Sequence, residues 1–469
     1  MLPVYIQYMG AETYGLVGFF TMLQAWFGLL DLGLTPTIGR ETSRYHGGAI
    51  SALAYRQIFR SLSILFFTFA AVGGAGLWGA SYQITIRWLN VGSLPIDDVS
   101  FAVEVMAVSV ALRWMCGLYR GVIAGTEKLA WLGGLTILMV TLRFIVVLPV
   151  MWRFGFTAPV FFIYQLFVAS IELIFLGLKA YNILPPIKTL EGPVGWSLQS
   201  ARSSLKFAMT IAFASIVWTL TTQSDKLLLS GILSLEEYGY FTLAVVVAGS
   251  IIVITSPVSS VIMPRMTVLN AENKQAELMH VYFQSTQLVS VVAGTSAATL
   301  GGFAEPLLFA WTGDLKVTQE AAPILRLYAI GYALLAVGAF PYYLQYAKGN
   351  LRYHLIGNIL VVLLILPGVV FGAHYYGATG AGCAWLTINA LYLIAWVGYV
   401  HKKMIPGLHW VWFRDGVLKC SFPGILISLV LLAFDLEFES RMQNLGYFVF
   451  TLILVFTVNL TSILLRRFR

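Results

Sequence analysis

The chain has 469 residues, of which 59% are hydrophobic and only 11% are charged. Soluble domains carry roughly 25% charged residues, so 29 basic and 21 acidic side chains are too few to cover a soluble surface of this size. The composition therefore excludes an ordinary soluble protein and predicts an all-α chain that crosses a membrane many times. The net charge of +8 does not imply a nucleic-acid partner, because membrane proteins concentrate Lys and Arg in cytoplasmic loops.

Several classes of site have no signal in the sequence. The three cysteines are scattered and form no Cys-x-x-Cys pair, and the six histidines occur singly. Neither a His-Glu-x-x-His motif nor a phosphate-binding Gly-x-x-x-x-Gly-Lys-Ser/Thr motif is present. We therefore expect no catalytic residues, no metal site, no bound cofactor and no intrinsic ATPase. The first residues lack a basic segment and a cleavage site, so no cleavable signal peptide is expected.

Thirteen apolar stretches are close to the ~20 residues that a helix needs to cross a bilayer. They are 15–36, 61–83, 101–123, 129–151, 157–178, 207–232, 238–262, 284–304, 322–346, 353–374, 378–400, 417–434 and 445–465. Residues 1–9, MLPVYIQYM, resemble the last turns of a further helix whose beginning is missing. We therefore predict 13 full transmembrane helices plus a truncated first one, on a 14-helix plan. A mis-assigned start or a truncated, inactive copy would explain the short first helix.

The loops between these stretches alternate in charge. Most of the 29 basic residues fall in every second loop, whereas the opposite loops hold acidic pairs such as Asp97–Asp98 and Glu236–Glu237. Membrane proteins keep their basic loops in the cytoplasm. The basic loops are therefore predicted to be cytoplasmic, and so are both chain ends if residues 1–9 are the remainder of a first span.

A short repeat divides the chain. YMGAETYGLVGFF (8–20) resembles LSLEEYGYFTLAV (233–245), and each copy precedes a long span and a basic exit. Six helices separate the copies, so they share one orientation, which is a parallel repeat of the kind found in alternating-access transporters. The expected parts are an N-terminal lobe at 1–178, a cytoplasmic linker at 179–206, a C-terminal lobe at 207–400, an interfacial connector at 401–416 and two additional transmembrane helices at 417–469.

Ionisable residues inside the spans need an explanation, because each costs at least ~2.5 kcal/mol to insert. Each could line a water-filled cavity between the lobes or form an interhelical pair that only holds the bundle together. The candidates are Asp31, Glu104, Arg113, Arg143, Glu172, Asp225 and Lys226.

Three arginines are candidates for substrate binding. Arg113 and Arg120 fall on one helical face, and Arg143 lies near the middle of the next span. Guanidinium donates two hydrogen bonds at once to phosphate and stays charged in a low dielectric. This group therefore indicates an anionic, phosphate-bearing substrate, unless Glu104 and Glu172 neutralise it.

Three further residues are candidates for coupling or gating. Asp225 and Lys226 are adjacent on one span, so their side chains should point ~100° apart and pair poorly with each other. Asp225 could instead carry a proton, bind Na⁺ or pair with a base on another helix. Asp31 precedes Gly33 and Pro36, which weaken the helix. It would be part of an inner gate or hinge, or form a local Asp–Arg pair.

GAETYGLVGFFTMLQAWFGLLDLGLTPTIGRETSRY (10–45) and TQSDKLLLSGILSLEEYGYFTLA (222–244) resemble Wzx-type polysaccharide flippases, the O-antigen branch of the multidrug/oligosaccharidyl-lipid/polysaccharide exporter superfamily. The resemblance implies a V-shaped transporter in the bacterial inner membrane, with two six-helix lobes and two extra helices. It implies ion-coupled transfer of undecaprenyl-diphosphate-linked oligosaccharide to the periplasmic leaflet, driven by H⁺ or Na⁺. It also implies a cationic cavity, contact with membrane lipids, and a polysaccharide polymerase and chain-length regulator as partners.

Other functions fit the sequence less well. A multidrug exporter of the same fold should have an acidic cavity for cationic drugs, whereas the first lobe offers arginines. The flippase for the peptidoglycan lipid precursor fits the opening motif less closely. An O-antigen polymerase, ligase or glycosyltransferase should carry a large periplasmic loop, but the longest outer loops are 84–100 and 305–321. A structural scaffold would not need buried charges in so many helices.

Overall fold

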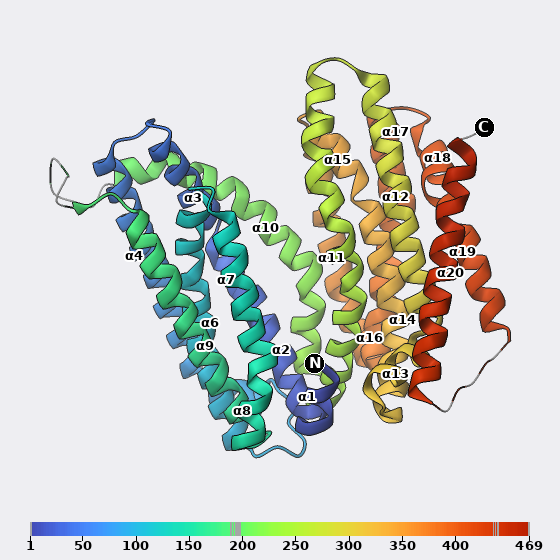
Figure 1. The fold of residues 1–469 in the computed structure, drawn as a ribbon, viewed down its shortest axis with the longest axis horizontal. Helices are drawn as coiled ribbons and strands as arrows, with labels where there is room; N and C mark the ends of the chain where they lie inside the picture. The colour runs from blue at the N-terminus through green and yellow to red at the C-terminus, as the bar shows by residue number, and fades with distance from the viewer. Residues whose placement is uncertain are drawn as a thin grey trace. The chain divides into compact units, whose positions relative to one another are not determined.

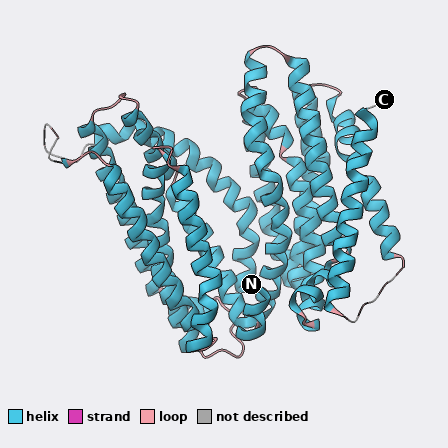
Figure 2. Ribbon diagram, viewed as in Figure 1, coloured by secondary structure: helices cyan, strands magenta, loops and turns pink. Residues whose placement is uncertain are grey.

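The computed structural model describes residues 2–187, 190, 192, 198–434, 436, 438 and 440–467, without the side chains of 2, 3, 198–214, 260 and 464–467. In these ranges the chain is helical and no strand is assigned (Figure 2). The single β-bridge there joins Asn90 to Ser234. The all-α class is thereby confirmed.

The chain divides into two compact units, Pro3–Glu236 and Glu237–Arg469, which run from blue to green and from green to red in Figure 1. The first unit contains α1 (Leu2–Met9), α2 (Ala11–Phe27), η1 (Gly28–Asp31), α3 (Leu34–His46), α4 (Ala52–Gly79), α5 (Ser81–Arg87), α6 (Ile96–Ala124), α7 (Leu129–Thr141), η2 (Leu142–Val146), α8 (Val147–Phe154), α9 (Ala158–Ile183) and α10 (Leu198–Ile232). The second contains α11 (Leu235–Ala271), except for its first two residues, which belong to the first unit. It also contains α12 (Gln275–Gly302), α13 (Ala304–Thr312), α14 (Leu315–Gly338), α15 (Phe340–Ala347), α16 (Arg352–Leu391), η4 (Tyr392–Trp396), α17 (Val397–Met404), α18 (Leu408–Val411), η5 (Trp412–Leu418), α19 (Lys419–Leu432) and α20 (Arg441–Arg467).

The described helices include ten that are long and apolar enough to cross a membrane, or eleven if the bent pair α12–α13 is one span. The chain is thus a multi-pass membrane protein, although the number thirteen is not confirmed. One of the ten, Arg352–Met404, has 53 residues, far more than the ~20 that one crossing needs. The non-helical backbone at Tyr376 and Gly377 divides it, which agrees with the two spans expected there.

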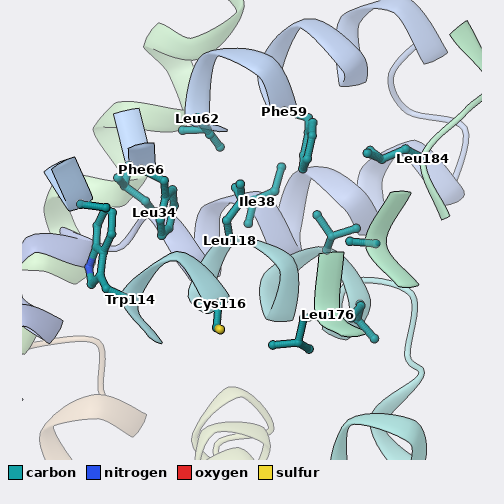
Figure 3. Close-up of a cluster of buried hydrophobic side chains, with 14 of the residues drawn as sticks. Leu34, Ile38, Phe59, Leu62, Phe66, Trp114, Cys116, Leu118, Leu176 and Leu184 are labelled. Carbon is teal, nitrogen blue, oxygen red and sulfur yellow. The ribbon is translucent and has the colours of Figure 1, made fainter. Parts of the chain in front are cut away.

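The first unit is built around α6, which contacts α2, α3, α4 and α9. Its apolar core, shown in Figure 3, includes Leu34, Ile38, Phe59, Leu62, Phe66, Trp114, Cys116, Leu118 and Leu176. Small residues let α3 and α6 approach closely. A β-carbon added at Gly125 would lie 2.3 Å from the carbonyl oxygen of Gly39. Close backbone approach at small residues is how membrane helices pack without a hydrophobic driving force.

Helix α10 packs against α2, α3 and α4, so the boundary between the compact units follows Glu236. The sequence placed 207–232 in the C-terminal lobe, after a linker at 179–206. Part of that linker lies outside the described residues. The division into two repeated lobes remains a prediction.

Both copies of the repeat have the same local structure. Gly10 (φ 84°) interrupts the helix between α1 and α2, and residues 233–234 interrupt it between α10 and α11. The Glu-x-Tyr-Gly sequence of each copy lies at the start of the helix that follows. Helix α1 thus precedes α2 across a one-residue break, as α10 precedes α11 across residues 233–234, and the missing beginning of a first span stays a prediction.

The two helix starts are joined by the segment 88–93, which follows α5. The Glu12 carboxylate accepts hydrogen bonds from the backbone N–H groups of Gly92 (2.7 Å) and Ser93 (3.0 Å). The Asn90 carbonyl accepts a bond from the N–H of Leu235 (3.0 Å), and the Asn90 side-chain amide donates to the carbonyls of residues 231–233, at and just after the end of α10. This segment therefore ties α2 to the junction of α10 and α11.

Candidate functional site

A cluster of charged side chains lies between α6, η2 and α9 of the first unit. The two carboxylate oxygens of Glu172 each accept a hydrogen bond, one from Arg120 and one from Arg143. The Glu172 and Arg143 side chains are 4% and 9% exposed, whereas Arg120 is 34% exposed. The second Arg120 nitrogen donates to the Thr136 hydroxyl at 3.3 Å. The interhelical pairing that the sequence left open is therefore present for these two arginines.

Arg113 belongs to the same cluster but has a different environment. It interacts electrostatically with Arg143, Arg120 and Glu172, and its guanidinium carbon lies 5.9 Å from the centre of the Phe20 ring. That distance is within the range of a cation–π contact. Among the side chains that the structure describes, Arg113 has no carboxylate within salt-bridge distance.

Glu104, the other carboxylate considered for neutralisation, has a different partner in the structure. It is within 3.5 Å of the Ser81 hydroxyl. The described part of this cluster therefore contains three arginines and one carboxylate, which leaves an excess of positive charge. Such an excess inside an apolar bundle costs free energy unless an anion or water compensates it.

The position of Arg143 depends on a local irregularity. Residues Leu142–Val146 form a π-helix, a bulge that leaves carbonyl groups without helical partners. Three side chains satisfy consecutive carbonyls: the Tyr164 hydroxyl donates to Leu142 (3.0 Å), the Gln165 amide to Arg143 (3.0 Å) and the Tyr5 hydroxyl to Phe144 (2.8 Å). These three residues are not among the candidates predicted from the sequence. Their only signal is a polar group inside an apolar span.

Asp31 accepts hydrogen bonds from the first turn of the helix that follows it. Its carboxylate accepts hydrogen bonds from the N–H (3.1 Å) and the hydroxyl (2.6 Å) of Thr35, in the first turn of α3. The helical path is interrupted between Asp31 and α3, as predicted, because Leu32 and Gly33 both have positive φ. The nearby Arg40 and Arg44 are paired with Glu41. Among the described side chains, Glu41 therefore pairs with these arginines, and the local Asp–Arg pair considered for Asp31 is not formed.

Asp31 also lies close to the arginine-bearing helix. A β-carbon at Gly117 would be 2.7 Å from the Thr35 hydroxyl and 3.9 Å from an Asp31 carboxylate oxygen. Gly117 stands between Arg113 and Arg120 along α6. The break between α2 and α3 therefore packs against the face that carries the cationic cluster.

The expectation that Asp225 and Lys226 would pair poorly was wrong. The Lys226 ammonium lies 3.3 Å from an Asp225 carboxylate oxygen and donates to the Thr222 carbonyl at 2.7 Å. The long lysine side chain folds back along α10, which brings its charge to the neighbouring carboxylate despite the ~100° between the two Cβ directions. Asp225 is 1% exposed.

Within the described residues, no group of three His, Cys, Asp or Glu side chains is placed to hold a metal ion. The arrangement that stands out is the cationic cluster, and its guanidinium groups are suited to binding phosphate.

Comparisons with known proteins agree with this architecture. Residues 1–270 match the model of the family described as polysaccharide biosynthesis protein. The "Uncharacterized membrane protein EpsK" of Bacillus subtilis (strain 168) is 22% identical, over 100% of this chain and 94% of that protein. A structure of the lipid II flippase MurJ in an inward closed conformation has 14% identity and a TM-score of 0.76, covering 100% of this chain and 96% of that chain.

An inward-facing multidrug-resistance transporter of the MATE family, in the MOP superfamily, has 13% identity and a TM-score of 0.69, covering 86% of this chain and 94% of that chain. At these identities the structural likeness establishes the fold, which is shared by MurJ and MATE proteins. The family match spans more than half of the sequence. The chain therefore belongs to the polysaccharide biosynthesis protein family.

Proposed function

We propose that this protein is a flippase that moves undecaprenyl-diphosphate-linked oligosaccharide units, such as O-antigen or other surface-polysaccharide repeats, from the cytoplasmic to the periplasmic leaflet of the bacterial inner membrane. The observation that carries the proposal is the arginine cluster of the first unit. Glu172 neutralises one of its three positive charges, and Arg113 has no carboxylate partner among the described side chains.

A diphosphate is the ligand that such a cluster favours. It carries negative charge in a compact group, and guanidinium donates to phosphate through two parallel N–H bonds. Arg113 makes a cation–π contact and, among the described side chains, no salt bridge, so binding an anion would not require breaking one of the described ion pairs. Arg120 is partly exposed and could turn toward a second phosphate. Arg143 is buried and ion-paired with Glu172, so it would mainly add to the positive electrostatic potential of the site.

The transport cycle follows from the chemistry of the substrate. A sugar headgroup loses its hydration in hydrocarbon, whereas the lipid tail can remain in the bilayer. Alternating access of a sheltered cavity would therefore carry the diphosphate and sugars across. We propose that H⁺ or Na⁺ drives this cycle through Asp225, whose paired Lys226 would respond to the carboxylate's charge. On this proposal the protein is a transporter and not an enzyme, and a polymerase and chain-length regulator act after it.

A multidrug exporter is the second candidate, because MATE transporters have the same fold. Its cationic substrates would be repelled by the excess of arginines in the first unit. The two candidates therefore differ in the expected effect of Arg113: its removal should impair transport of an anionic lipid-linked glycan and should not impair export of a cationic drug.

The test uses a strain that lacks this gene but retains its polysaccharide glycosyltransferases. We expect loss of surface polymer, with completed lipid-linked units held in the cytoplasmic leaflet, and rescue by the native gene. Arg113→Ala should rescue at least tenfold less well, which is the effect of one lost charge-assisted bond. Arg113→Lys should be intermediate. Arg153→Ala is the matched control, because Arg153 is exposed at the end of α8.

Two results would contradict the proposal. One is single repeat units that reach the periplasm in the deletion strain and accumulate there unpolymerised, which would favour a polymerase. The other is full rescue by Arg113→Ala at native protein level, which would remove the arginine cluster from the substrate path.

A further inference from the structure

A cavity of about 580 Å³ lies in the second unit, between α11, α13 and the start of α20. Its walls are mostly apolar, and the Ser250 hydroxyl donates to the Val247 carbonyl of its own helix at 2.6 Å. Arg441 is the one charged residue among the described residues that line it. The apolar lining consists of Val246, Val247, Leu307, Ala310, Trp311 and Leu445.

The guanidinium of Arg441 is held in place by the end of α13. Its Nε donates to the Ala310 carbonyl (3.2 Å) and one terminal nitrogen donates to the Trp311 carbonyl (3.0 Å). The last carbonyls of a helix have no partner within the helix, so both bonds satisfy groups that need a donor. Gly313, with φ 70°, leaves room for this arrangement, because a β-carbon there would lie 3.0 Å from the guanidinium carbon.

These contacts leave most of the guanidinium available. Arginine has five N–H donors, and the two carbonyls use two of them. Among the side chains that the structure describes, no carboxylate forms a salt bridge with Arg441. The result is a positioned cation with free donors at the rim of an apolar cavity. Val246 and Leu445 are 47% and 42% exposed, so the cavity is accessible from the side of the unit.

We propose that this cavity binds a membrane phospholipid, with the phosphate on Arg441 and an acyl chain along the apolar walls. Its volume is within the ~300–1,000 Å³ of ordinary ligand sites, and a basic group beside an apolar cleft between membrane helices matches the two halves of a phospholipid. The charge pattern of the loops puts the start of α20 on the periplasmic side, so the lipid would belong to the periplasmic leaflet.

A simpler role for Arg441 is that of a helix cap alone. A cap requires only the two carbonyls of α13. If Arg441 were only a cap, the cavity would bind a phospholipid and a neutral lipid equally well. Phosphate-dependent occupancy of the cavity therefore separates the two roles. This inference does not depend on the identity of the transported substrate.

The test is photo-labelling of the purified full-length protein with phosphatidylglycerol that carries a diazirine on one acyl chain, followed by mass spectrometry of the labelled peptides. We expect labels on 246–250 and around Leu445. Arg441→Gln should reduce these labels about tenfold, the size expected for a lost charge-assisted bond. Arg326→Gln is the matched control, because Arg326 is an outer-side arginine paired with Glu305. It should leave the labels unchanged.

Arg441→Gln also removes the two hydrogen bonds to the end of α13, so a loss of labelling could follow from a change in that helix. A second variant separates the two effects. Leu445→Trp would fill the cavity while leaving Arg441 in place, and it should abolish labelling at 246–250. Diazirine-bearing diacylglycerol, which lacks the phosphate, should label at least fivefold less than phosphatidylglycerol, a difference of about 1 kcal/mol.

Three results would overturn the proposal. Equal labelling by diacylglycerol would show that the phosphate is not recognised. Labelling at 246–250 that is unchanged by both Arg441→Gln and Leu445→Trp would place the lipid elsewhere. Displacement of the label by undecaprenyl phosphate, but not by excess unlabelled phosphatidylglycerol, would assign the cavity to the polyprenyl lipid and not to a membrane phospholipid.

Discussion

Gly15 of α2 lies directly against the backbone of Leu235, so that a β-carbon added to Gly15 would be 2.1 Å from the Leu235 carbonyl oxygen. Gly15 belongs to the Glu-x-Tyr-Gly sequence of the first repeat copy, and Leu235 begins the helix that carries the second. The two copies of one sequence motif thus meet at a backbone contact that only glycine permits. This contact fixes the junction of α10 and α11 against α2.

Gly15→Ala is therefore expected to destabilise the first unit by about 1–3 kcal/mol, the usual cost of overpacking. The contacting atom is a backbone oxygen and cannot swing away as a side chain would. Thermal unfolding of the purified protein in detergent would show a lowered Tm. Gly76→Ala is the matched control, because nothing lies within 4 Å of a β-carbon at that position of α4. Equal Tm values for the two variants would refute the close contact.

Asn90 is expected to hold the end of α10 through its side-chain amide, which donates to the carbonyls of Gly231, Ile232 and Leu233. Asn90→Ala should leave these carbonyls without that donor at a cost of about 1 kcal/mol. Hydrogen exchange should become faster at 230–236, including the N–H of Leu235. Ser93→Ala removes a bond to Glu12 only and should leave exchange at 230–236 unchanged. Unaltered exchange in Asn90→Ala would show that the backbone bridge holds the junction alone.

Glu172 is expected to matter more for stability than either arginine that it binds. Glu172→Gln would leave Arg120 and Arg143 without their carboxylate, and breaking a buried pair in this way costs about 3–5 kcal/mol. Glu172→Gln/Arg143→Met should be more stable than Glu172→Gln alone, because it removes the buried charge that was left unpaired. Tm and the yield of folded protein would measure both. A double variant no more stable than the single one would mean that Arg143 finds another partner.

The apolar stretches predicted the helical class and the approximate position of the spans, because length and hydrophobicity largely decide whether a segment can cross a bilayer. The break after Asp31 was also predictable, since Gly33 and Pro36 are local signals. These features depend on residues that are close together in the sequence.

The partners of the charged residues were not predictable in the same way. Whether Glu104 or Glu172 pairs with the arginines depends on how α6 and α9 are rotated and shifted relative to each other. The apolar stretches predict where a span lies in the sequence, but not this rotation or shift. The Cβ directions of Asp225 and Lys226 do not predict their pairing, because the lysine side chain is long enough to bring its ammonium to the neighbouring carboxylate. The π-helix that carries Arg143 has no sequence signature, and only its hydrogen-bond donors hint at it.

Two substitutions of Asp31 separate its role in the helix break before α3 from the role of its negative charge. Asp31→Ala removes the acceptor of the Thr35 N–H and hydroxyl and should cost about 1–3 kcal/mol, the penalty for polar groups that lose their partner. Asp31→Asn keeps an oxygen acceptor at the same place, so the Tm should stay near the native value. If Asp31 acts through the geometry of the break, Asp31→Asn should also restore surface polysaccharide in the deletion strain, whereas Asp31→Ala should not. An Asp31→Asn protein with a native Tm but no rescue would show instead that the negative charge itself is needed, which would place Asp31 in ion coupling.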